Sequence, residues 1–67
     1  MSPRRLSTMV QELRTKNEMS QRELAKKAGV SDGYIAHLES GLRKNPSLAV
    51  LKRIAKALGV PVTTLLE

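Results

Sequence analysis

Residues 20–41 read SQRELAKKAGVSDGYIAHLESG, and this stretch carries the start and stop signals of two short helices. Ser20 and Glu23 have the spacing of a capping box, in which each side chain accepts a hydrogen bond from the backbone amide of the other residue. Gly29 is the residue type that most often follows the last turn of a helix, because it adopts left-handed backbone angles without steric cost. The sequence therefore predicts a first helix over residues 21–28.

A second helix is predicted after only three further residues. Ser31 is a good N-cap and Gly41 is again a stop signal, which together predict a helix over residues 32–40. Two helices of about two turns joined by a short glycine-containing turn form the helix-turn-helix unit, whose second helix enters the major groove of DNA. An ordinary helical hairpin of a small bundle has the same pattern and remains an alternative.

Apolar residues in this stretch are spaced for packing between the two helices. Leu24 and Ala28 face inward from the first helix. Ile35 and Leu38 face inward from the second helix, and Ala25 is small enough to let the helices cross closely. One hydrophobic core is therefore expected beneath both helices.

Signals of the same kind predict three more helices in the rest of the chain. They are a helix from a Ser2 N-cap and Pro3 to about Asn17, one from a Ser47 N-cap to a stop at Gly59, and a short one from Pro61 through Leu66. One apolar stripe of the second of these consists of Leu48, Leu51, Ile54, Ala55 and Leu58. The expected fold is all-α, with five helices in a single domain over residues 1–67.

The charge balance points to the class of partner. The chain has 12 Lys and Arg against 6 Asp and Glu, a net charge of +6 in 67 residues, which favours a polyanion. Tyr34 is the only aromatic residue, whereas binders of single-stranded nucleic acids usually stack bases on several aromatic rings. Duplex DNA is therefore the expected partner.

Several other classes of function are excluded by residue content. The chain has no cysteine and one histidine, which excludes disulfides and thiolate metal sites, and we expect no cofactor and no small-molecule ligand. It has no glycine-rich phosphate loop and no carboxylates paired at a catalytic spacing, so we expect no enzyme. No apolar run approaches the roughly 18 residues of a membrane span, and a cytoplasmic location is expected.

Two longer segments resemble a known family. Residues 19–41, MSQRELAKKAGVSDGYIAHLESG, and residues 45–60, NPSLAVLKRIAKALGV, are similar to the Cro/repressor-type (Xre-like) helix-turn-helix DNA-binding domain. The resemblance covers about residues 6–66. It implies a compact five-helix, lambda-repressor-like domain that binds duplex operator DNA as a two-fold dimer and regulates transcription. The segment from Gly41 to Pro46 is about one residue longer than the family pattern.

Helical geometry assigns the outer face of the predicted second helix to base recognition, because exposed N-terminal residues of such a helix reach base edges. The predicted base-contacting residues are Asp32, Gly33, Ala36 and His37. The family resemblance implies readers at three of these positions, those of Asp32, Gly33 and His37. Each has a simpler alternative. Asp32 can do no more than interact favourably with the helix dipole, Gly33 can be a tolerated substitution without a function, and His37 can be an exposed residue without a role.

Phosphate contacts are predicted on both sides of this helix. They would come from Gln21 and Arg22 at the start of the preceding helix, where free amides favour an anion, and from polar residues within and after the second helix. The full predicted set is Gln21, Arg22, Tyr34, Ser40, Arg43, Lys44 and Asn45. Tyr34 can equally pack against the fold, and Arg43 and Lys44 can belong to a solvated loop. The remaining basic residues, Lys26, Lys27, Lys52, Arg53 and Lys56, are interpreted as solvated helix faces.

Two structural roles complete the predictions. The resemblance implies a partly buried ion pair between Arg14 and Glu39, which would fix the position of the second helix. A homodimer is expected because one short helix supplies few base contacts. Its predicted interface consists of Val60, Val62, Leu65 and Leu66, although these residues could instead close the core of one chain.

An alternative function stays open beside that of a DNA-binding regulator. The chain could be a DNA-binding antitoxin, or the DNA-binding domain of a larger regulator, and act through a protein partner. An antitoxin usually needs an additional segment that wraps its toxin, and we find none in the sequence.

Overall fold

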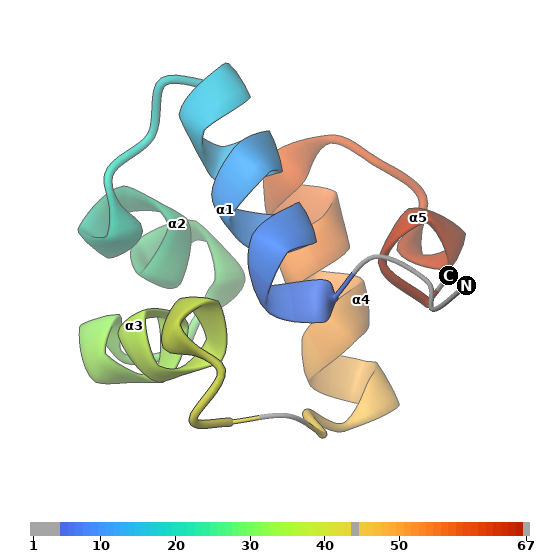
Figure 1. Cartoon of the computed structure of the whole chain (residues 1–67). Helices are drawn as coiled ribbons and strands as arrows, with labels where there is room; N and C mark the ends of the chain where they lie inside the picture. Colours follow the sequence, from blue (N-terminus) through green and yellow to red (C-terminus); the bar gives the residue numbers. More distant parts are fainter. Residues whose placement is uncertain (1–4, 44, 67) are drawn as a thin grey trace.

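The computed structural model describes residues 5–43 and 45–66 and contains five α-helices and no strand within those ranges. In chain order the helices are α1 (Leu6–Lys16), α2 (Gln21–Ala28), α3 (Asp32–Ser40), α4 (Leu48–Leu58) and α5 (Val62–Leu66) (Figure 1). The all-α, five-helix architecture predicted from the sequence is confirmed. None of the helices is long and apolar enough to cross a membrane in the described part of the chain.

Capping interactions define α2 and α3 as the sequence predicts. The Glu23 amide donates to the Ser20 hydroxyl at 3.0 Å and the Ser20 amide donates to the Glu23 carboxylate at 2.8 Å, which completes the capping box. The Ser31 hydroxyl accepts from the Tyr34 amide at 3.0 Å and begins α3. Gly29 has a φ of 72°, which allows the chain to turn sharply between the two helices.

The start of α1 differs from the prediction. Arg5 is the N-cap and has extended backbone angles, so the helix begins at Leu6 rather than at Pro3. Ser2 and Pro3 themselves lie outside the described residues. Leu6 is the first residue of the helix that packs against the core, and a local capping signal does not extend a short helix beyond the turns that packing stabilises.

The core is wholly aliphatic and lies between all five helices. Val10, Leu24, Ile35, Leu38 and Ile54 are completely buried. α2 packs against both α3 and α4, while α1 contacts α3 and α5 (Figure 1). The predicted stripe of α4 is wrong at one end, because Leu48 is 52% exposed. It occupies the first position of α4, before the turn at which Leu51 meets the core.

Candidate nucleic-acid interface

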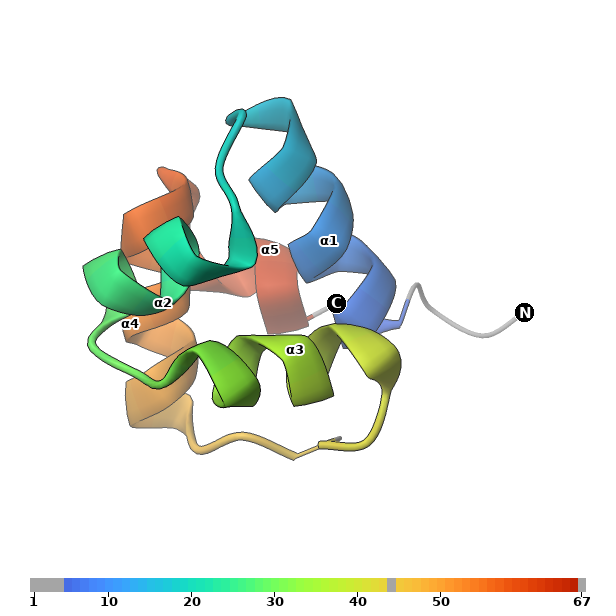
Figure 2. The ribbon, with the colours of Figure 1, turned by 90° about the vertical axis from the view of Figure 1, so that its left-hand side faces the viewer.

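α3 has one buried face and one uncovered face. Ile35 and Leu38 are fully buried and hold the helix on the core. The predicted base-contacting residues lie on other sides of the helix. Asp32, Gly33 and His37 are exposed and Ala36 is half-buried. Figure 2 shows α3 running along one edge of the fold. The helix can therefore present these residues to an external surface without any change in packing.

Gly33 is not explained by packing inside the protein. It lies in the first turn of α3, and a Cβ atom built on it would meet nothing within 4 Å apart from its chain neighbours and the nearby backbone of its own helix. Glycine in a helix costs roughly 1 kcal/mol relative to alanine. Within the described structure no neighbouring atom requires glycine at this position. Either an external partner requires it, or it has no functional reason.

The N-terminal end of α2 carries two predicted phosphate-contacting residues, and both interact within the chain. Gln21 is half-buried, and its Nε2 donates to Glu39 Oε1 at 3.1 Å. Arg22 Nε lies 3.8 Å from Asp32 Oδ2, and both side chains are largely exposed, at 85% and 63%. An exposed pair at this distance contributes little to stability. Arg22 is therefore available to an external anion, and it also brings positive charge close to Asp32.

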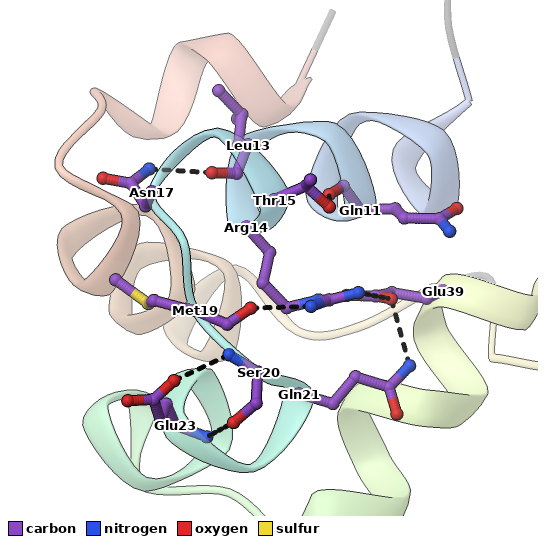
Figure 3. Close-up of polar contacts among 10 residues, drawn as sticks. All are labelled: Gln11, Leu13, Arg14, Thr15, Asn17, Met19, Ser20, Gln21, Glu23 and Glu39. Atoms are coloured by element: carbon purple, nitrogen blue, oxygen red, sulfur yellow. Dashed lines mark hydrogen bonds and ion pairs between the residues drawn. The ribbon is translucent and has the colours of Figure 1, made fainter.

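Arg14 and Glu39, the pair implied by the family resemblance, make a bidentate ion pair between α1 and α3 (Figure 3). Arg14 Nε lies 2.6 Å from Glu39 Oε2, and Arg14 Nη2 donates to Glu39 Oε1 at 3.1 Å. Arg14 Nη1 also donates to the Met19 carbonyl oxygen at 2.7 Å. The two side chains are only 16% and 5% exposed. The hydrogen bond to Glu39 is the main reason that the pKa of Arg14 is raised above its usual value.

Glu39 thus collects three donor contacts from two other helices, two from Arg14 and one from Gln21. With the bond from Arg14 to Met19, these contacts join α1, α2, the segment between them and α3 (Figure 3). Sequence reasoning did not anticipate the bond between Gln21 and Glu39, because nothing in the spacing of these residues indicates that their side chains meet.

The segment after α3 folds back onto the same surface. The Arg43 amide donates to the His37 carbonyl oxygen at 3.1 Å, and the Arg43 guanidinium lies over the Tyr34 ring, 4.7 Å from its centroid. His37, Leu42, Arg43 and Asn45 line an open hollow of about 410 Å³. The structure therefore brings a predicted base reader, His37, beside two predicted phosphate-contacting residues. Lys44, the remaining predicted residue of this segment, lies outside the described residues.

Two residues of this surface need further comment. Ser40 is exposed, but its hydroxyl donates to the His37 carbonyl oxygen at 3.1 Å, so a phosphate contact requires the hydroxyl to turn away from the helix. Leu42 was not selected from the sequence, yet it is 76% exposed and adjoins His37 in the hollow. The sequence did contain a clue to its exposure: Leu42 is a large apolar residue in a loop between two predicted helices, outside every predicted core position.

The predicted dimer residues do not all lie on the surface. Leu65 is 4% exposed and belongs to the core of the chain, so its assignment to an interface is wrong. Val60 and Val62 are half-buried against that core, and Leu66 is 54% exposed. The reason is that α5 packs on α4 and α1 through one side, which covers Leu65 and leaves Leu66 open.

Four basic residues assigned to solvated faces gather in one place. Lys26, Lys27, Arg53 and Lys56 line a hollow of about 540 Å³ between α2 and α4, with small residues such as Ala28 and Ala57 on its wall. All four basic side chains are exposed. The positive charge of the chain is therefore not confined to the surface around α3.

Comparison with known proteins places this geometry in a family. A family model described as helix-turn-helix matches residues 10–65. The HTH-type transcriptional regulator SinR of Bacillus subtilis (strain 168) is 38% identical over 58 residues, which are 87% of this chain and 52% of SinR. The chain therefore spans about half the length of this relative.

Solved structures agree with the fold. The crystal structure of SinR in complex with DNA has a TM-score of 0.89 at 35% identity, covering 92% of this chain and 98% of that chain. The restriction-modification controller protein C.AhdI from Aeromonas hydrophila has a TM-score of 0.85 at 33% identity, covering 90% of this chain and 89% of that one. These relatives are named as a transcriptional regulator and a controller protein. Because the family model matches most of the chain, the protein belongs to the helix-turn-helix family of the Cro/repressor (Xre-like) type.

Proposed function

We propose that this protein binds duplex DNA in a sequence-specific way and thereby regulates transcription in the cytoplasm. The observation that carries the proposal is the uncovered face of α3, which bears short or neutral side chains and has two exposed arginines beside it, Arg22 near Asp32 and Arg43 over the Tyr34 ring. Positive charge around a nearly neutral recognition surface fits the division between phosphate contacts, which position the protein, and base contacts, which give specificity.

Base recognition in this proposal comes from the outer face of α3. His37 exchanges hydrogen bonds with a purine edge, Asp32 accepts from the N4 amino group of cytosine, and Ala36 contacts a thymine methyl group. Gly33 allows the helix to approach the floor of the groove closely. The empty space around the Gly33 Cα supports this role, since nothing described within the chain excludes a larger residue there.

Phosphate recognition comes from the residues around that face. Arg22 and Arg43 supply charge, and Tyr34, Ser40 and Asn45 supply neutral polar groups. Gln21 can contribute although its amide is bonded to Glu39, because the NH₂ group of glutamine has two hydrogens and only one is used in that bond. Glu39 and Arg14 then act indirectly, by holding Gln21 and α3 at a fixed distance.

Dimer formation on a palindromic operator is part of the same proposal. A nine-residue helix reaches few base pairs, and two copies on half-sites one helical turn apart double the number of contacts. The exposed Leu66 and the half-buried Val60 and Val62 are the surface that we assign to the second copy.

Selection of bound sites from random DNA duplexes at a fixed salt concentration tests the proposal. We expect enrichment of a palindrome, and binding of the selected duplex to be at least about 1,000-fold tighter than that of a scrambled duplex of the same composition. Equal affinity for both duplexes after repeated selection would show that the protein binds DNA only through its charge.

A further inference from the structure

An open hollow of about 530 Å³ lies between the start of α1 and the end of α3. Arg5, the N-cap of α1, and Ser7 in its first turn line one side, while Ser40 and Arg43 line it from the end of α3 and the segment that follows. Figure 2 shows the first turn of α1 beside the C-terminal end of α3. Two arginines that are distant in the sequence therefore line one hollow at the edge of the proposed DNA-binding surface.

The electrostatics of this hollow favour an anion. Its lining includes Arg5 and Arg43 and no acidic residue, and the first turn of α1 has no acidic residue either. Arg5 and Arg43 are both exposed, and neither forms an ion pair with another described residue. Two arginines without a described ion-pair partner in the lining of one hollow make its potential positive, which attracts an anion.

Arg43 is also restricted in where its charge can lie. Its guanidinium rests over the Tyr34 ring, and its backbone amide is bonded to the His37 carbonyl oxygen. Less side-chain freedom is therefore lost when it binds a ligand. The half-buried Ser7 adds a hydroxyl on the opposite wall, a group that commonly donates to phosphate oxygens in protein–DNA contacts.

We propose that this hollow binds one phosphate group of the DNA backbone, held jointly by Arg5 and Arg43 with Ser7 as a neutral donor. Guanidinium groups suit phosphate oxygens because their planar donors match the oxygen geometry. The inference rests on the proposed function, since the hollow adjoins the end of α3 that would lie in the groove. It adds the first turn of α1 to the DNA contacts, a segment for which the sequence indicated no role in binding.

A double-variant experiment tests whether one phosphate is shared. The affinity for the selected duplex is measured against salt concentration for the wild-type chain, Arg5→Ala, Arg43→Ala and the double variant. Each phosphate neutralised contributes about 0.9 to the slope of log affinity against log salt. We expect the double variant to lose about 0.9 in total, because both arginines serve one phosphate. A loss of about 1.8 would mean two separate phosphates and would overturn the shared site.

Arg53→Ala is the matched control, because Arg53 is an exposed arginine that lines the other basic hollow, between α2 and α4. It removes the same charge from the protein while leaving the proposed phosphate site intact. We expect its salt slope to equal that of the wild-type chain. If Arg5→Ala and Arg53→Ala lower the affinity equally with equal slopes, Arg5 acts only through the general field and the inference is wrong.

A duplex with one neutral methylphosphonate linkage identifies the source of the phosphate. When the linkage is moved along the selected site, at one position it should weaken DNA binding by the wild-type chain and leave binding by the double variant Arg5→Ala/Arg43→Ala unaffected. Absence of such a position, or saturation of the site by inorganic phosphate at millimolar concentration with no effect on DNA binding, overturns the inference. Loss of preference for the selected duplex in the wild-type chain is a different result, and it would reject the proposed function itself.

Discussion

Replacement of Glu39 by alanine tests the ion pair that joins α1 to α3. The Glu39 side chain is 5% exposed and accepts from Arg14 Nε, Arg14 Nη2 and Gln21 Nε2. Glu39→Ala removes all three contacts and leaves the Arg14 guanidinium, 16% exposed, with its bond to the Met19 carbonyl oxygen. The variant therefore leaves the mostly buried Arg14 guanidinium without its counter-charge.

The expected loss is about 3 kcal/mol in the free energy of unfolding. Removal of one partner of a buried pair costs about 3–5 kcal/mol, and the remaining bond to Met19 together with the partial exposure of Arg14 places this case at the lower end. For a domain of this size, a loss of about 3 kcal/mol lowers the melting temperature by roughly 12–24 °C. The effect is a large fraction of the total stability, which is about 3–10 kcal/mol for a chain of this length.

Urea unfolding followed by circular dichroism at 222 nm measures the loss, and a paired variant separates charge from packing. In the double variant Arg14→Met/Glu39→Leu no unpaired charge is left, so we expect its stability to lie within about 1 kcal/mol of the wild-type chain. Its affinity for the selected duplex should nevertheless fall, because Gln21 loses its acceptor and α3 loses its link to α1.

A small loss of stability would contradict the reasoning. A loss below about 1 kcal/mol for Glu39→Ala would place the pair among solvent-exposed ion pairs and contradict its burial. The contribution of the ion pair to stability should not change with pH through the titration of Arg14 in the physiological range. The pKa of Arg14 is raised by its hydrogen bond to Glu39, so the stabilisation from the charged guanidinium is fully present below its usual pKa and is lost only in strong base.

Three further predictions concern α3 and the ends of helices. Gly33→Ala should raise the free energy of unfolding by about 1 kcal/mol in the urea assay and should weaken binding of the selected duplex. The control is Gly29→Ala, which should lower the free energy of unfolding by about 1–2 kcal/mol because Gly29 has a φ of 72°. Tighter specific binding by Gly33→Ala would contradict close approach to the groove. His37→Ala should weaken specific binding by about 1–3 kcal/mol in mobility-shift titrations and spare a scrambled duplex, whereas equal losses on both would remove His37 from base recognition. Leu66→Glu should change stability by less than about 0.5 kcal/mol and lower the dimer fraction in sedimentation, and an unchanged fraction would exclude Leu66 from the interface.

The sequence predicted helix boundaries best where the signal is local. The capping box of Ser20 and Glu23 and the stops at Gly29 and Gly41 need only neighbours three or four residues away, and the structure confirms each of them. The uncovered face of α3 was also predictable. The burial of Ile35 and Leu38 follows from helical periodicity alone, and it fixes which side of the helix remains uncovered.

Features that depend on distant parts of the chain could not be predicted in the same way. The start of α1, the exposure of Leu48 and the burial of Leu65 are decided by where each helix end meets its neighbours. Their residue types suit either environment. Sequence spacing also gave no sign that Arg5 would lie near Arg43, because only the packing of α1 on α3 brings them together.

The contact between Arg43 and Tyr34 has a practical consequence for spectroscopy. Tyr34 is the only aromatic residue of the chain, and its ring lies on α3 beneath the Arg43 guanidinium. All intrinsic ultraviolet fluorescence of this protein therefore originates beside the proposed DNA-binding surface, with no emission from the aliphatic core. Tyrosine emission should thus follow events at α3 without an attached dye, and it should change in Arg43→Ala even before any DNA is added.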